Sequence, residues 1–243
     1  IRKVIIDDLA NRKHCCDILI DQNFGRSPQD YEHLVSKKTK VFTGSEYVIL
    51  KDDFKITRNK SQLKRLNREP KCLNICMGGM DKDNSTYNIL ETVLKSGYFK
   101  KWSIDVVLRS SSPHAKMILN YSDKSPHNIN LHFDCENMAT LFEGADLAIG
   151  AGGVTLWERC CVGLPTLLLT IADNQVPAAM AMSRSGAIIY CGDIREKDWK
   201  KKLDLKLKML TQDTDRLHLI SKIAFGICDG NGLEKVCNII ESN

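Results

Sequence analysis

The feature that most constrains this chain is a regular alternation of short apolar runs and amphipathic segments, which starts at Cys72. Apolar runs such as ADLAI (residues 145–149) and TLLLTI (residues 166–171) have the length of buried strands. Between such runs, apolar residues recur at helical spacing, as in residues 84–96, after which Gly97 ends the pattern. Strands that alternate with helices favour a parallel sheet covered on both faces. We therefore predict an α/β fold with a doubly wound, Rossmann-like sheet.

The same pattern places the individual elements and indicates where a ligand would bind. It predicts strands at residues 72–77, 104–108, 129–133, 145–149, 166–171 and 187–190, helices at residues 84–96, 113–121, 136–143, 155–162 and 176–185, and further helices toward the C-terminus. Ligands of such sheets bind at the carboxyl ends of the strands, where the strand order reverses. Functional residues are therefore expected in the loops that follow the strands.

The N-terminal residues differ from this regular part. KVII (residues 3–6) and DILI (residues 17–20) read as short buried strands, and residues 41–50 are apolar and extended. Two strands with almost no helix between them do not form a stable sheet alone. We predict that they end a sheet whose other strands are absent from this chain. The expected division is a remnant of a largely missing N-terminal domain (1–48), a basic linker (49–70) and a nucleotide-binding domain (71–243).

Composition narrows the function classes. Hydrophobic residues make up 43% of the chain, which excludes wholesale disorder, and no apolar run approaches the length of a membrane span. The net charge of +5 comes from two basic runs, residues 55–71 and 197–208. These are either patches for nucleic acid or an anionic membrane, or a solvated linker and a solvated helix face. We favour the second interpretation, because neither run interleaves aromatic residues as single-strand binders do.

The ten cysteines contain no C-x-x-C pair, and several lie inside apolar runs, where a reduced cysteine behaves as a small hydrophobic residue. Neither a disulfide framework nor a zinc site is expected. We predict reduced thiols and a cytoplasmic location, with no metal.

The most informative loop is GAGGVTLWE, residues 150–158, between a predicted strand and a predicted helix. Gly152 and Gly153 allow a close approach of backbone to ligand, and the helix N-terminus favours a phosphate. Thr155 can cap the helix or donate to a phosphate oxygen, and Glu158 can accept hydrogen bonds from both hydroxyls of a ribose. Thr155 stands where the dinucleotide-binding fingerprint has its third glycine, so a tight turn with a solvated glutamate is the alternative.

Three further loops follow strands and carry weaker signals. Gly78 and Gly79 leave room for a diphosphate, with Asp83 or Asn84 as the expected cap of the next helix. Asn174 and Gln175 can bind sugar hydroxyls, or they cap a helix. In the segment from His132 to Met138, backbone groups can contact a base edge. His132 itself is interpreted as a structural residue.

Taken together, these loops make the chain resemble the UDP-sugar hydrolases of the pseudaminic acid pathway and the related spore coat polysaccharide glycosyltransferase-like proteins. The residues that carry the resemblance are IIDDLANRKHCCDILIDQNFGR (5–26), YEHLV (31–35), GSEYVILKDDF (44–54), ICMGGMD (75–81), the block from Glu136 to Gln175, and DGNGLEKV (229–236). The resemblance covers nearly the whole chain and implies a GT-B-like architecture.

The resemblance also implies roles for named residues. Gly78, Gly79, Gly152, Gly153, Val154 and Thr155 would lie at the diphosphate, Glu158 at the ribose, Glu136, Asn137 and Met138 near uracil, and Asn174 and Gln175 near the sugar or phosphate. The implied reaction is hydrolysis of the sugar–UDP bond, which releases a 2,4-diacetamido-2,4,6-trideoxy hexose without a metal or other cofactor. The implied partners are the UDP-sugar substrate, the UDP product, and the missing N-terminal domain or other enzymes of the pathway, with no nucleic acid and no membrane.

One departure matters for activity. The family's catalytic histidine lies in a G-x-G-H loop, and these 243 residues contain no such motif. We therefore expect no catalytic residue in this chain and no hydrolysis by the chain alone. A GT-B glycosyltransferase that uses a UDP-sugar, and a fragment that binds nucleotide without catalysis, are the alternative hypotheses.

Overall fold

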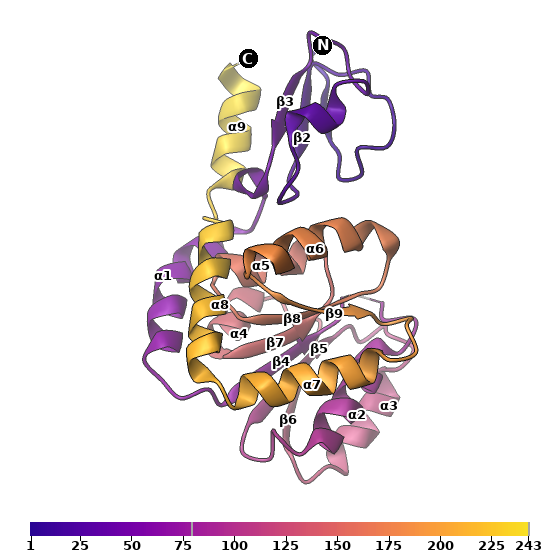
Figure 1. Ribbon diagram of the computed structural model, residues 1–243, viewed down its shortest axis with the longest axis vertical. Helices are drawn as coiled ribbons and strands as arrows, with labels where there is room; N and C mark the ends of the chain where they lie inside the picture. The colour runs from indigo at the N-terminus through magenta and orange to yellow at the C-terminus, as the bar shows by residue number, and fades with distance from the viewer. Residues whose placement is uncertain (79, 243) are drawn as a thin grey trace.

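The computed structural model describes residues 1–78 and 80–242, and the strands in these ranges form two parallel sheets (Figure 1). The smaller, here the small sheet, consists of β1 (Val4–Ile6), β2 (Ile18–Asp21) and β3 (Lys40–Thr43), with β2 in the middle. The two N-terminal strands expected from sequence are confirmed, but only β2 is buried as expected, since Ile6 in β1 is 55% exposed. The third strand occupies the beginning of the segment that was expected to be extended.

The larger sheet, here the large sheet, has the strand order β6-β5-β4-β7-β8-β9, and all of its pairs are parallel. The order reverses between β4 and β7, so these two neighbours define the switch point of a doubly wound fold. The bounds are β4 (Cys72–Cys76), β5 (Ser103–Leu108), β6 (Asn128–Phe133), β7 (Leu147–Gly150), β8 (Thr166–Thr170) and β9 (Ile189–Asp193). The predicted α/β class and parallel sheet are confirmed.

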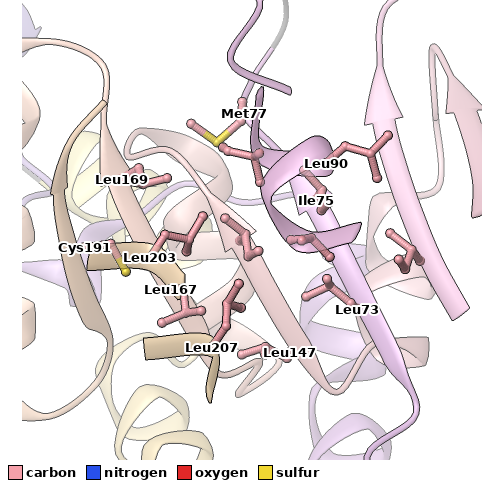
Figure 2. Packing of buried hydrophobic residues seen from close by; sticks show 14 of the residues in the cluster. Leu73, Ile75, Met77, Leu90, Leu147, Leu167, Leu169, Cys191, Leu203 and Leu207 are labelled. Carbon is pink, nitrogen blue, oxygen red and sulfur yellow. The ribbon is translucent and has the colours of Figure 1, made fainter. Parts of the chain in front are cut away.

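Helices cover both faces of the large sheet because its central strands are apolar on both sides. Alternate residues of β8 divide between the two faces, with Leu167 and Leu169 in one core cluster and Leu168 in the other. Figure 2 shows the first cluster, in which β4, β7 and β8 side chains gather around Leu203 and Leu207 of α7. That face carries α2 (Ser85–Ser96), α3 (Ala115–Asp123) and α7 (Trp199–Thr211). The opposite face carries α1 (Asp52–Leu66), α4 (Met138–Gly144), α5 (Val154–Cys161), α6 (Val176–Ser185) and α8 (Thr214–Ile227).

The first basic run is not a solvated linker, and that prediction is wrong. Most of it forms α1, whose Arg65 is only 3% exposed. The Arg65 guanidinium donates hydrogen bonds to carbonyl oxygens at the C-terminal ends of α4 and α5, at 2.9 Å to Phe142 and 2.8 Å to Val162. Carbonyls at a helix C-terminus lack partners within the helix and attract cations. The arginines of the run therefore hold α4 and α5 in place.

The second basic run behaves as predicted. Within α7, Leu203, Leu207 and Leu210 are buried while the lysines between them lie toward solvent. The run is the solvated face of an amphipathic helix.

The last helix returns to the small sheet. After α8 the chain forms α9 (Gly232–Ser242), which lies beside the small sheet in Figure 1. Val236 of α9 packs in a cluster with Ile18 and Ile20 of β2. Short 3-10 turns lie at Pro28–Tyr31, Ser45–Tyr47 and Asp173–Gln175. In the described part of the chain, no helix is long and apolar enough to cross a membrane, and the ten cysteines are free thiols.

Candidate nucleotide-binding site

A cavity of about 440 Å³ opens at the carboxyl edge of the large sheet, beside the switch point between β4 and β7. Its lining brings together four residues singled out from sequence, which come from three different loops: Gly78, Met138, Thr155 and Glu158. The remaining lining residues are Cys76, Val107, Leu108, Arg109, Asp134 and Cys135. The volume lies within the range of small-molecule pockets, and the position is where a doubly wound sheet binds its ligand.

The N-terminus of α5 forms one wall of this region. Gly153 occupies the N-cap position with φ at 95°, in the left-handed region that favours glycine. Gly152 packs against Gln175, since a Cβ on Gly152 would lie 3.1 Å from the Gln175 Cδ. The first turn of α5 presents N–H groups and a partial positive charge, which together can hold a phosphate.

Glu158 is the clearest chemical signal in the cavity. Its carboxylate is largely buried, and Oε2 has no hydrogen-bond partner among the described residues. Burial raises the pKa of Glu158, an effect that the nearby charges of Arg159 and Lys51 partly offset. A buried carboxylate without donors is costly. A ligand with adjacent hydroxyl groups would supply these donors.

Arg159 packs beneath the loop of residues 150–153 on its buried side, and the sequence did not predict this role. Its side chain is fully buried, and Nη2 donates to the Ala151 carbonyl oxygen at 2.6 Å. A Cβ on Gly150 would overlap Arg159 Nη1 and lie 2.8 Å from the Cys76 carbonyl oxygen. Gly150 is therefore needed for close packing, whereas Gly152 and Gly153 shape the surface. The signal in the sequence for a buried arginine was its place inside the largely apolar run LWERCC.

A second, smaller cavity of about 90 Å³ contains Gly152, Gly153, Asn174 and Gln175, together with Asp8 and Asn23 from the small-sheet side. Gln175 Oε1 accepts a hydrogen bond from the Ile171 N–H at 3.0 Å, which fixes the loop after β8. Asn174 is exposed at the cavity. The structure thus places these two amides beside the glycine loop rather than beside the larger cavity.

Other residues predicted from the sequence lie outside the linings of the two cavities. Glu136 and Asn137 are exposed, and Asn137 caps α4 by accepting from the Thr140 N–H at 3.2 Å. Val154 is 61% exposed. Gly79 lies outside the described residues.

Two local details complete the comparison with the sequence. Asn84 occupies the N-cap position of α2, as one of the two expected residues, but its side chain makes no cap hydrogen bond. The Asp81 carboxylate accepts from the Ser85 and Thr86 N–H groups in its place. His132 Nε2 lies 3.1 Å from Asp105 Oδ1, away from both cavity linings. In residues 1–78 and 80–242, no group of three or more His, Cys, Asp or Glu side chains could hold a metal ion.

Comparisons with known proteins bear on this geometry. No family model matches the chain. It is 27% identical over 222 residues to the spore coat polysaccharide biosynthesis protein SpsG of Bacillus subtilis (strain 168), a match covering 85% of this chain and 60% of that protein. It is 28% identical over 185 residues to the UDP-2,4-diacetamido-2,4,6-trideoxy-beta-L-altropyranose hydrolase of Campylobacter jejuni, covering 76% and 63%.

The chain is related to both proteins. The resemblance drawn from its motifs is therefore confirmed. Among solved structures, MurG of Acinetobacter baumannii matches with a TM-score of 0.64 at 16% identity, covering 93% of this chain and 66% of MurG. This likeness shows a GT-B-like fold. The chain spans about three fifths of the length of the two curated relatives.

Proposed function

We propose that this chain is the nucleotide-binding part of a UDP-sugar hydrolase that acts in surface-polysaccharide biosynthesis. The expected reaction releases UDP from a 2,4-diacetamido-2,4,6-trideoxy hexose. The relatives' names support the substrate class, since one is a hydrolase of such a UDP-sugar and the other a spore coat polysaccharide protein. In this proposal, residues 71–243 bind the nucleotide, residues 1–48 belong to a second domain and residues 49–70 connect the two.

The observation that carries the proposal is the unpartnered Glu158 Oε2 in the larger cavity, one helical turn from Thr155. We assign the uridine to this cavity, with the ribose hydroxyls on Glu158 and the base toward Met138. The diphosphate would lie at Gly78, Gly152, Gly153 and Thr155, against the positive end of α5. The sugar would then extend toward Asn174.

This arrangement would favour cleavage by stabilising the leaving group. When the sugar–UDP bond breaks, negative charge develops on the diphosphate. Preorganised N–H groups at a helix N-terminus stabilise such charge without reorganising. The hydrolysis also needs a group that activates water, and the linings of the two cavities contain no histidine.

A glycosyltransferase that uses a UDP-sugar is the second candidate, favoured by the fold shared with MurG. The two candidates have the same nucleotide site and differ in the attacking group, which is water in one and an acceptor hydroxyl in the other. Supplying the full-length protein with UDP-sugar in the absence of an acceptor separates them, because only a hydrolase turns over.

Calorimetry with UDP tests the nucleotide site. We expect the wild-type chain to bind UDP, and Glu158→Ala to weaken binding by about 1–3 kcal/mol, the usual loss for hydrogen bonds to a charged group. Glu241→Ala, at an exposed position in α9, is the matched control and should leave the affinity unchanged. Absence of binding at millimolar UDP would contradict the site assignment. An unchanged affinity in Glu158→Ala would remove Glu158 from the ribose role.

A further inference from the structure

The small sheet contributes an acidic side chain to the region beside the glycine loop. Asp8 follows β1, and it lines both the cavity of about 90 Å³ and a neighbouring cavity of about 190 Å³. Asn23 and Asn174 line the same two cavities. We propose that Asp8, with these two amides, forms a subsite that binds the hexose of a nucleoside diphosphate sugar. This inference rests on the proposed function and extends it to the sugar.

The backbone of Asp8 is held firmly. Asn23 Nδ2 donates to the Asp8 carbonyl oxygen at 3.0 Å, and Arg26 Nη2 donates to the same oxygen at 3.4 Å. Both of these residues are in turn fixed by Asp21, whose carboxylate accepts from the Asn23 N–H at 2.8 Å and from Arg26 Nε at 2.9 Å. Asp8 is thus anchored through its main chain, which leaves its side chain available.

A buried polar network stands behind this anchor. The Tyr31 hydroxyl lies 2.7 Å from Asp21 Oδ2 and 2.9 Å from Asp7 Oδ2, and all three residues are buried. Burial and the two carboxylates raise the pKa of Tyr31, so the phenol keeps its proton and can donate it to these oxygens. Since Asp7 directly precedes Asp8, the network fixes the carboxyl ends of β1 and β2 in one geometry.

Asp8 is exposed and lines both cavities, and its carboxylate makes no hydrogen bond or ion pair with another described residue. An ionised carboxylate only accepts hydrogen bonds, while an amide side chain both donates and accepts. This set matches a sugar ring with hydroxyl or acylamino groups. The cavity of about 190 Å³ is also lined by Arg26 and Arg184, whereas the described lining of the cavity of about 90 Å³ contains no cation. In this smaller cavity the negative charge of Asp8 would repel a phosphate.

In the cavity of about 90 Å³, the helix N-terminus and Asp8 therefore favour different parts of the ligand, the diphosphate and the sugar. The N-terminus of α5, with Gly152 and Gly153, favours the anionic diphosphate. Asp8 lines the same small cavity as these glycines, and its carboxylate favours the uncharged sugar. A nucleoside diphosphate hexose could place its diphosphate at the helix N-terminus and its hexose at Asp8. A free nucleoside diphosphate has no hexose and would make no contact with Asp8.

Isothermal calorimetry with two probes, UDP and UDP-N-acetylglucosamine, tests the subsite. Asp8→Ala should weaken binding of UDP-N-acetylglucosamine by about five- to tenfold, as expected for a lost hydrogen bond to a charged group. UDP should bind within about twofold of wild type, or slightly more tightly, because a repulsive charge is removed. Asp123→Ala, at the C-terminal end of α3 near the amino edge of the sheet, is the control and should change neither affinity.

The outcomes separate the subsite from the proposed function. If the wild-type chain does not bind UDP, the proposed function fails. If UDP binds but Asp8→Ala leaves the affinity for UDP-N-acetylglucosamine unchanged, or the wild-type chain does not bind that probe, the subsite is overturned. An equal loss of both ligands also overturns it, because that result indicates a general structural role for Asp8.

Discussion

At the scale of single residues, the buried Glu158 carboxylate has a cost in stability, which its proposed role in binding would offset. Its pKa is raised by burial, so the folded protein holds its proton more tightly than the unfolded chain does. The free energy of unfolding then falls as pH rises from the ordinary carboxyl range through the raised pKa. In the proposed site, the ionised form of Glu158 is the better acceptor for ribose hydroxyls, because an ionised carboxylate only accepts hydrogen bonds.

Glu158→Gln should therefore move stability and affinity in opposite directions. At pH 7 we expect the variant to unfold at a higher urea concentration than wild type, because no buried charge remains. We expect its affinity for UDP to fall about tenfold. Urea titration and calorimetry measure the two effects. The contribution of Glu158 to UDP affinity, taken as the difference between wild type and variant, should shrink as pH is lowered through its raised pKa. A difference that does not vary with pH would contradict this role.

The sequence predicts some residues of the candidate site and misses others, and the difference has a physical reason. Thr155 and Glu158 were found because they follow a glycine loop within one helical turn, so local spacing carries the signal. Asp8 depends on contacts between segments far apart in the chain, as in the cavity that it shares with Asn174. Arg159 contacts the nearby Ala151 carbonyl oxygen, but only the fold shows that its side chain turns inward. Periodicity contains no information on such contacts.

At the scale of elements, α1 determines how firmly α5, the helix that begins at the glycine loop, is held. Arg65 binds the ends of α4 and α5, and Arg58 donates to the Cys161 carbonyl oxygen at 2.6 Å while stacking over the Phe225 ring. The carboxyl end of α5 is thus fixed by α1, and its amino end is left for the ligand. Burial lowers the pKa of Arg65 to about 10, so the guanidinium is still charged at neutral pH.

Arg65→Met should lower the free energy of unfolding by at least about 3 kcal/mol, because several buried carbonyls would lose their donors together. Lys64→Met is the matched control on the same helix. Lys64 lies 3.5 Å from the buried carboxylate of Glu143, but the Lys64 side chain is itself 43% exposed and Lys60 also pairs with Glu143, at 3.2 Å. Loss of Lys64 should therefore cost less than about 1 kcal/mol. Chemical denaturation compares the two, and equal effects would show that Arg65 is not an anchor.

The misinterpretation of this element has a clear origin. In the run from Lys55 to Lys71, lysines and arginines look alike as positive charges, and a high density of charge indicates a solvated segment. The structure separates them: the Lys60 side chain is 75% exposed and that of Lys64 43%, whereas Arg65 is almost completely buried.

Strands and helices from Cys72 onward were predicted well, since strands buried on both faces are continuous apolar runs.

At the scale of the whole molecule, the small sheet is joined to the rest of the protein in two places that touch each other. The chain leaves the small sheet through Val48 to enter α1 and returns through Gly232 to form α9. A Cβ on Gly232 would overlap the Val48 carbonyl oxygen, so the two passages are packed backbone against backbone. Ser45 Oγ adds a hydrogen bond to the Ile227 carbonyl oxygen at 2.6 Å.

Gly232→Ala should therefore lower the free energy of unfolding by about 1–3 kcal/mol, the usual range for overpacking. Gly226→Ala provides a control of opposite sign. A Cβ on Gly226 meets nothing within 4 Å, and alanine in a helix stabilises by up to about 1 kcal/mol relative to glycine. Urea unfolding of both variants checks the prediction, and a stabilised Gly232→Ala would show that the two passages do not pack as described.

The contact between Val48 and Gly232 also has a mechanical consequence. Because both passages meet at one place, a rotation of the small sheet about that place would also move Asp8, which lines the two cavities. A small rotation about this place becomes a larger displacement farther from it, so the gap between Asp8 and Asn174 would change more than the gap at Gly232. The width of the proposed sugar subsite would then depend on torsions in a few backbone residues that lie outside its lining.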